Sequence, residues 1–448
     1  MNAQSPVRGA ELLQAGRIGI GPHWLARLAA GGFQRVLDRI DRGLASGRIE
    51  TTLPDGAIRV LGGRAPGFTA IVTLHSWNAL IRLATGGSVG WYQAWEAGEW
   101  SSPDPVPLFA LFMANAATLG GAARARGPWR LAMRTLHALR RNTHGGAARN
   151  VAAHYDLGND FYGAWLGELR VYSSAMFEDQ PAPSRWQQHI SPLDFAQLSK
   201  ISTVIARMKV DHTSRVLEIG CGWGALAAAL AGTAASVEAI SLSDEQLAYC
   251  RRRQELGGQP RDGQPRDGQP REGKPRNTSA NLQFRKLDYR DVSGTYDAIA
   301  SIEMVEALGR AYWPSFLGVV AGALRPGGRA VIQYISIRDD LFDAYAASAD
   351  FIQTYVFPGG MLIRTSEFRA LAEARGLIWH DEFSFGNHYA ATLESWRANF
   401  DAAVEEGRLP AGFDDKFVRL WRYYLMYCEG GFGGGGIDVS QVTLVKGG

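Results

Sequence analysis

The chain has 448 residues, of which 46% are hydrophobic and 20% are charged. This length predicts two or three folding units, and the composition excludes a largely disordered protein. The formal net charge of +3 argues against a general nucleic-acid-binding protein. The three cysteines have no CxxC spacing, which disfavours a disulfide framework or a metal site and fits a reducing cytoplasm.

The first 120 residues predict a small α+β unit. A helical pattern over residues 33–44 is followed by alternating segments at 58–61 and 70–74, which are typical of short strands. The uncharged run 105–123 is too interrupted by polar residues and glycines to span a membrane. We expect a helix there that is either buried or in contact with lipid, with core packing favoured.

Residues 121–150 form a basic linker that contains no Asp or Glu. Its arginines are Arg124, Arg126, Arg130, Arg134, Arg140, Arg141 and Arg149. Such a stretch could bind the anionic surface of a membrane, since each cation near an anionic bilayer contributes about 1 kcal/mol. A solvated linker without a partner explains the same residues. The N-terminus lacks the apolar core of a signal peptide, so we expect a cytoplasmic protein, peripheral at the inner face of the membrane.

Residues 151–448 predict an α/β unit with a doubly wound sheet. Short apolar runs at 216–219, 237–240, 298–301 and 330–333 alternate with helical patterns, as in βαβ units with a parallel sheet. Residues 258–277 repeat the unit GQPRD, whose prolines and lack of apolar side chains predict a disordered insertion. An insertion without function is the favoured interpretation of the repeat.

A glycine turn follows the strand at 216–219. Gly220, Gly222 and Gly224 form GxGxG and precede an apolar helix at 225–231, so the backbone can turn sharply and approach a ligand closely. The next strand ends at Ser241, and a third ends near Asp288, which can accept a hydrogen bond from an adenine amino group. This spacing favours a class I methyltransferase. A nicotinamide or flavin site is the alternative, but it predicts an acidic residue where Ser241 stands.

The sequence resembles the cyclopropane-fatty-acyl-phospholipid synthases and their mycolic acid relatives over nearly its whole length. The resemblance is carried by the segments 154–162 (HYDLGNDFY), 172–175 (YSSA), 243–247 (SDEQL), 301–306 (SIEMVE), 355–360 (YVFPGG) and 421–424 (WRYY). It implies a class I fold with helical additions, a smaller N-terminal α+β domain, and methyl transfer from S-adenosylmethionine to the double bond of unsaturated acyl chains in membrane phospholipids. Members of the family are often dimers, so a homodimer is possible.

The resemblance also implies roles for individual residues. Those that would bind the cofactor are Tyr172, Ser173, Gly220, Gly222, Gly224, Ser241, Gln246 and Tyr289, with Asp288 added from the general methyltransferase scheme. Those that would line the catalytic pocket are Ser174, Glu306, Gln333, Ile335 and Tyr389. A carboxylate and aromatic ring faces suit this chemistry, because methylating an alkene generates a carbocation.

Two of these five pocket positions depart from the family. Cyclopropane-forming members are expected to hold a bicarbonate ion that removes a proton from the added methyl group, and their cysteine and histidine positions are Ser174 and Gln333 here. Because Gln cannot act as a base, bicarbonate is a doubtful partner of this chain. We therefore expect a methyl-branched or methylene-bearing unsaturated product, with a cyclopropane as the alternative.

Two other functions explain part of the sequence. A methyltransferase of a soluble small molecule would keep the fold but leave the N-terminal unit and the arginines without a role. A lipid-binding protein with an inactive site would not require the cofactor glycines. Incubation with labelled S-adenosylmethionine and either liposomes or metabolites separates these alternatives.

Overall fold

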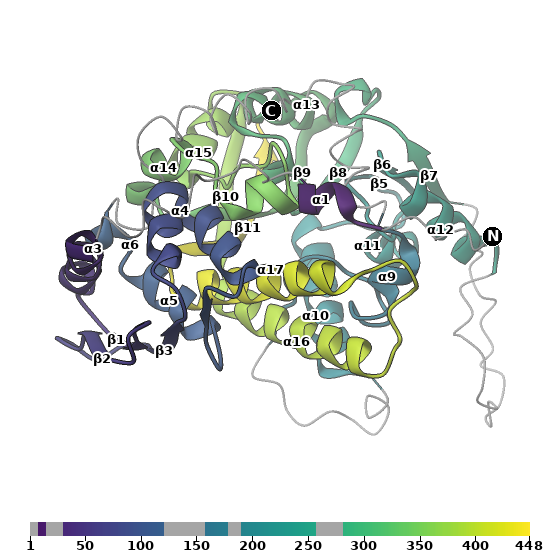
Figure 1. Cartoon of the computed structure of the whole chain (residues 1–448). Helices are drawn as coiled ribbons and strands as arrows, with labels where there is room; N and C mark the ends of the chain where they lie inside the picture. Colours follow the sequence, from purple (N-terminus) through teal and green to yellow (C-terminus); the bar gives the residue numbers. More distant parts are fainter. Residues whose placement is uncertain (1–7, 15–29, 121–156, 178–189, 257–280) are drawn as a thin grey trace.

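The computed structural model describes residues 8–14, 30–120, 157–177, 190–256 and 281–448. The basic linker and the GQPRD repeat lie outside the described residues. Within this described part, no helix is both long enough and apolar enough to cross a membrane. Figure 1 shows the helices and strands of residues 30–119 at one end of the molecule, with the larger sheet extending from the centre to the other end.

The N-terminal elements form a four-stranded sheet with helices beside it, as the sequence predicts. The sheet order is β2-β1-β3-β4, with β1 and β3 parallel. Leu61, Ala70 and Val72 turn inward from alternating positions and are buried. The elements are α3 (Ala30–Gly43), β1 (Arg48–Thr52), β2 (Ile58–Gly62), β3 (Thr69–Leu74), α4 (Asn78–Glu96), β4 (Trp100–Ser101), α5 (Val106–Ala114) and α6 (Ala116–Leu119).

The larger sheet has seven strands in the order β10-β11-β9-β8-β5-β6-β7. The parallel arrangement that we expected holds for β9, β8, β5, β6 and β7. The strand β11 lies antiparallel between β9 and β10, in a segment where no strand was predicted. The strands are β5 (Arg215–Ile219), β6 (Ser236–Ser241), β7 (Leu282–Lys286), β8 (Tyr296–Ile302), β9 (Leu324–Ile337), β10 (Leu377–Ser384) and β11 (Ile437–Lys446).

Helices cover both faces of this sheet because its strand residues are apolar on both sides. Val216 packs with residues of α10, α11 and α12, whereas its neighbour Leu217 packs with residues of α13 and α15. This alternation is the period of two that a strand imposes. The helices that complete the described part are α1 (Ala10–Gln14), α9 (Asn159–Gly163), α10 (Pro192–Met208), α11 (Ala225–Ala231), α12 (Asp244–Glu255), α13 (Trp313–Ala323), α14 (Asp339–Ala346), α15 (Thr365–Glu373), α16 (Gly386–Glu405) and α17 (Asp415–Gly433).

Short helical segments connect the remaining elements at the carboxyl edge of the sheet. These are the 3₁₀ helices η1 (Tyr289–Asp291), η2 (Val305–Ala307) and η3 (Arg310–Tyr312), and the π-helix η4 (Ile352–Val356). The segment η2 directly follows β8, and η1 follows β7. The segments after β7 and β8, two strands that β5 and β6 separate in the sheet, therefore lie at the edge where ligands bind in open α/β folds.

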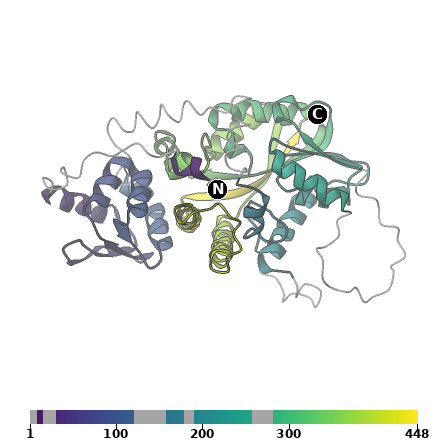
Figure 2. The same ribbon diagram turned by 45° about the vertical axis from the view of Figure 1, so that its right-hand side comes forward.

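The N-terminal elements pack against α17 and η4 through aromatic rings. The ring centroid of Tyr92 on α4 lies 5.0 Å from that of Tyr423 and 4.7 Å from that of Tyr355. Phe109 on α5 lies 5.2 Å from Tyr423 by the same measure. Figure 2 shows α16 and α17 between the N-terminal elements and the sheet. The N-terminal elements thus share one apolar core with α16 and α17.

Candidate functional site

The glycine turn after β5 forms an open cradle. The backbone N–H groups of Gly220 and Cys221 each donate to the carbonyl oxygen of Ile240, at 3.0 Å, which holds the turn against β6. Gly222 has a φ of +52°, and a Cβ added there would meet nothing within 4 Å. A Cβ at Gly224 would instead meet Phe284 and Cys250 at 2.9 and 3.0 Å. Gly222 therefore faces the cavity, while Gly224 allows close packing behind the turn.

Polar side chains border this cradle. Ser241 Oγ donates to Gln246 Oε1 at 3.1 Å, and the Asp288 carboxylate accepts from Arg290 Nε at 2.8 Å. Glu218 is buried in β5 with no hydrogen-bond partner for Oε2 among the described residues, and burial raises the pKa of this carboxyl to about 8. The unpartnered Oε2 atom beside the open glycine turn can accept a hydrogen bond from a bound ligand.

The remaining predicted cofactor residues surround the same space. Tyr172 and Tyr424 are joined by a hydrogen bond of 2.8 Å between their hydroxyl groups. Ser173 Oγ accepts from Lys200 Nζ at 2.6 Å. Tyr289 lines the cavity, as do Tyr172, Ser173, Ser241 and Asp288. Eight of the nine predicted cofactor residues thus line one cavity, and Gly224 lies behind its wall.

The cavity has a volume of about 510 Å³ and extends from the glycine turn to the N-terminal elements. Its far wall is apolar and consists of Leu83, Trp91, Phe109, Phe112, Met113 and Leu119, which come from α4, α5 and α6. The described part of the uncharged run, residues 105–120, therefore contributes both to the core and to the cavity. Leu108 and Leu111 are buried in the core, whereas Phe112 and Met113 line the cavity.

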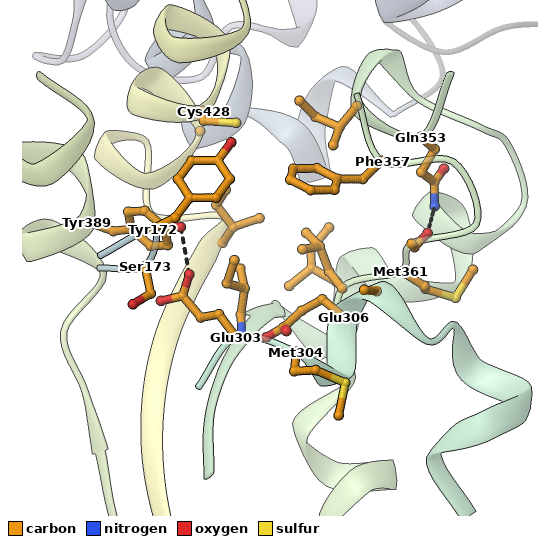
Figure 3. Close-up of a pocket in the computed structure, with 18 of the residues that line it drawn as sticks. Tyr172, Ser173, Glu303, Met304, Glu306, Gln353, Phe357, Met361, Tyr389 and Cys428 are labelled. Carbon is orange, nitrogen blue, oxygen red and sulfur yellow. Dashed lines mark hydrogen bonds between the residues drawn. The ribbon is translucent and has the colours of Figure 1, made fainter. Parts of the chain in front are cut away.

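A carboxylate cluster lies between the glycine turn and the apolar wall. Glu303 Oε1 accepts from the backbone N–H of Ser174 at 2.9 Å and from Gln333 Nε2 at 2.6 Å. Glu303 Oε2 accepts from the Tyr389 hydroxyl at 2.7 Å. Figure 3 shows the Glu303 side chain pointing toward Tyr389 and Ser173. Three donors from distant segments thus hold one buried carboxylate.

Glu306 is the second carboxyl group of this cluster. Its Oε1 accepts from the backbone N–H of Ile335, while Oε2 has no hydrogen-bond partner among the described residues. Burial, together with the nearby charge of Glu303, raises the pKa of Glu306 to about 8. Burial also raises the pKa of Glu303, but the Tyr389 hydroxyl and the charge of Lys200 lower it. Glu303 is therefore the better placed of the two to be ionised at neutral pH.

The five predicted pocket positions divide into two groups. Glu306, Ile335 and Tyr389 line the cavity. Ser174 and Gln333 are fully buried and do not belong to the described cavity lining. The Gln333 amide is occupied at both ends, because Nε2 donates to Glu303 and Oε1 accepts from Gln441 Nε2 at 2.9 Å.

The charged residues of the cavity lining that were not predicted as functional are Arg170, Lys200, Glu218, Glu303 and Asp350. Glu303 is in the SIEMVE segment that carries the resemblance, and it follows a parallel strand directly, where functional side chains gather. Lys200 is fully buried on α10, and burial lowers its pKa to about 8. The spacing of Ala196, Lys200 and Val204 places this lysine on the apolar face of the helix. A charged residue on the apolar face of a predicted helix is the feature of the sequence that could have identified Lys200 as a candidate site residue.

Known proteins resemble this chain in sequence and in fold. The model of a family described as mycolic acid cyclopropane synthetase matches residues 143–266 and 270–442. The tuberculostearic acid methyltransferase of Mycobacterium tuberculosis is 34% identical over 389 residues, which cover 83% of this chain and 82% of that protein. The cyclopropane-fatty-acyl-phospholipid synthase of Escherichia coli K12 is 29% identical over 297 residues, which cover 66% of this chain and 67% of the synthase.

Solved structures share the fold. The cyclopropane synthase MmaA2 from Mycobacterium tuberculosis aligns with a TM-score of 0.55 at 24% identity, covering 67% of this chain and 98% of that one. The mycolic acid cyclopropane synthase CmaA1, in a complex with SAH and CTAB, gives the same TM-score of 0.55, identity of 24% and coverage of 67% and 98%. The uncovered third of this chain leaves room for the additional N-terminal elements.

Proposed function

This chain belongs to the mycolic acid cyclopropane synthetase family and is an S-adenosylmethionine-dependent methyltransferase, and we propose that it methylates the double bond of unsaturated acyl chains in membrane phospholipids. One observation carries the proposal: a single cavity joins the open turn at Gly222 to an apolar wall, with Glu303 and Glu306 between them. An acyl chain on that wall would bring its double bond to the carboxyl groups. A soluble, polar metabolite would leave the apolar wall unused.

The residues of the cavity suit a reaction that passes through a carbocation. When bound, the cofactor supplies an electrophilic methyl group. The alkene must be held in line with that group and away from water, which an apolar cavity achieves. Tyr389 stacks on Phe432 with ring centroids 4.3 Å apart, and both line the cavity. Aromatic faces and the Glu303 carboxylate stabilise positive charge as it develops.

We propose that the nine predicted cofactor residues, with Gly224 acting through packing, form the cofactor site. We also propose that the product is a methyl-branched or methylene-bearing unsaturated chain. Two observations support this product. Gln333 cannot act as a base and is hydrogen-bonded at both ends. The relative that is 34% identical is named for tuberculostearic acid rather than for a cyclopropane. A cyclopropane product is the alternative.

The product can be identified in cells that express this chain and contain unsaturated phospholipids. Labelled methionine would mark the added carbon, and gas chromatography with mass spectrometry of the lipid fraction would identify it. A labelled, branched chain that retains unsaturation is expected. A labelled cyclopropane would contradict the product, and label confined to small metabolites would contradict the substrate class.

We further propose that the basic linker holds the enzyme at the anionic inner face of the membrane. These residues lie outside the described part of the chain, so the proposal rests on their charge. Replacing Arg130, Arg134, Arg140 and Arg141 by Gln is expected to weaken binding to anionic vesicles and to reduce its salt dependence. Replacing the exposed residues Arg251, Arg252 and Arg253 by Gln is the control. Unchanged vesicle sedimentation by the linker variant would contradict this role.

A further inference from the structure

The donors around Glu303 form an anion-binding site that the chain fills with its own side chain. The Ser174 N–H, Gln333 Nε2 and the Tyr389 hydroxyl all donate to the Glu303 carboxylate, over 2.9, 2.6 and 2.7 Å. Two of these three residues, Ser174 and Gln333, occupy the positions that depart from the bicarbonate-binding pattern. Such a set of donors is typical of a site for a small oxyanion.

A separate bicarbonate ion does not fit these residues. Ser174 and Gln333 are 0% exposed, and Glu303 stands between them and the cavity. The Ile335 N–H, a fourth donor of the expected set, is taken by Glu306 Oε1. The expected bicarbonate site has five positions. The donors at four of them, residues 174, 333, 335 and 389, already bind the side chains of Glu303 and Glu306, and Glu306 is itself the fifth position.

The backbone at Glu303 supports a built-in role for this carboxylate. Glu303 has a φ of +49°, a conformation that non-glycine residues rarely adopt. Its N–H donates to the carbonyl oxygen of Gln333 at 2.8 Å, which anchors this conformation to β9. Unfavourable backbone conformations of this kind persist where the surrounding structure enforces them, often at functional sites. Here the conformation directs the carboxylate to the cavity beside Tyr389, as Figure 3 shows.

We propose that Glu303 is the catalytic base of the reaction and takes the place of a bound bicarbonate ion. The proposal rests on the proposed function and deepens it. Addition of the methyl group to one alkene carbon leaves the neighbouring carbon electron-deficient. A hydride then shifts from the methylated carbon to its electron-deficient neighbour, which leaves the positive charge on the methylated carbon. The Glu303 carboxylate then takes a proton from the added methyl group, and the C–H electron pair becomes the carbon–carbon π bond of a methylene product.

The electrostatic surroundings suit this proton transfer. Glu303 faces Lys200 and Tyr389, whose charge and hydroxyl favour the ionised form, and Glu306, whose raised pKa keeps it neutral near pH 7. Burial raises the pKa of Glu303, which makes it a stronger base than an exposed carboxylate. One ionised and one neutral carboxyl side by side is the arrangement expected when two acids share a low-dielectric site.

The experiment measures methyl transfer to unsaturated phospholipid vesicles by the full chain, with and without bicarbonate. In buffer depleted of carbon dioxide, the wild type is expected to keep its activity. Glu303→Gln is expected to lose about 100-fold or more, the usual contribution of a general base, while binding S-adenosylmethionine normally by calorimetry. Glu303→Ala is expected to regain part of its activity when bicarbonate or formate is added. Glu394→Gln, at an exposed position of α16, is the control and should match the wild type.

Two results would overturn the inference. One is a wild type that methylates lipid only when bicarbonate is present, which would leave the proposed function intact. The other is a Glu303→Gln variant with near wild-type turnover. If Glu303→Gln binds the cofactor normally, its loss of activity is not caused by misfolding. The bicarbonate test on the wild type needs no variant, so it does not depend on the folding of one. A wild type that labels no lipid under either condition would refute the proposed function and the inference with it.

Discussion

Glu303 and Glu306 are three residues apart in the sequence, yet their surroundings favour the ionised form of Glu303 more than that of Glu306. Glu303 accepts three hydrogen bonds, whereas Glu306 accepts one at its side chain and keeps one oxygen unpartnered among the described residues. Each hydrogen bond to a carboxylate favours its ionised form, and a neighbouring negative charge disfavours it. The pair can therefore supply a base and a neutral acid at the same pH.

Lys200 is expected to control the pH dependence of this pair. It faces Glu303 and Glu218, and its charge lowers the pKa of both carboxyl groups. Replacing it by Met removes that charge, so the pKa of Glu303 should rise and the acid limb of the kcat profile should move to higher pH. Lys416→Met, at an exposed position of α17, is the control. An acid limb at the wild-type pH would contradict the electrostatic role of Lys200.

At the scale of elements, α10 and the turn after β5 position the site by local rules. The Ser191 side chain caps α10 by accepting from the Asp194 N–H at 3.0 Å, and Pro192 occupies the first turn. The face of α10 that contains Ala196, Lys200 and Val204 is buried, so Lys200 points inward. The strand β6 and the helix α11 end at Ser241 and Ala231, where the sequence predicts.

The turn itself gives a test of the cofactor site. Gly222→Val would place a branched side chain in the open cradle, at a φ of +52° that valine rarely adopts. S-adenosylmethionine binding, measured by calorimetry, should be abolished, while the far-ultraviolet circular dichroism should keep its helical signal. Gly407→Val is the matched control, because Gly407 has a φ of +67° and open space around it but lies away from the cavity lining. Normal cofactor binding by Gly222→Val would show that this glycine does not face the ligand.

At the scale of the whole molecule, one cavity depends on both the N-terminal elements and the methyltransferase sheet. Residues of α4, α5 and α6 form its apolar wall, and α17 packs against α4 and α5. The boundaries at residues 120 and 151 stay a prediction, as do the homodimer and the peripheral location. The shared cavity nevertheless gives the N-terminal elements a direct part in binding the substrate that we propose.

A side chain that fills the apolar end should shorten the acyl chain that fits. Ala116 on α6 lines the cavity, whereas its neighbour Ala117 is exposed. Ala116→Trp is expected to raise KM for long-chain phospholipids several-fold while sparing shorter chains, because the added ring takes up space at the far wall. Ala117→Trp serves as the control on the same helix. Equal loss for all chain lengths would place the acyl chain elsewhere.

The sequence by itself determined what depends on neighbouring residues: the glycine turn and the strands and helices beside it. It also carried the family resemblance, which pointed to Gly222, Glu306 and Tyr389 among the residues that line the cavity. The turn and its neighbouring elements follow from local periodicity and motif spacing. It did not determine the reversed strand β11, because the direction of a strand depends on pairing with distant segments. Nor did it identify Glu303, which the sequence presents as one acid in a matching motif. Only the tertiary structure brings Ser174, Gln333 and Tyr389 around Glu303. These donors come from segments that are far apart in the chain, so they meet only when α16 has packed against the sheet.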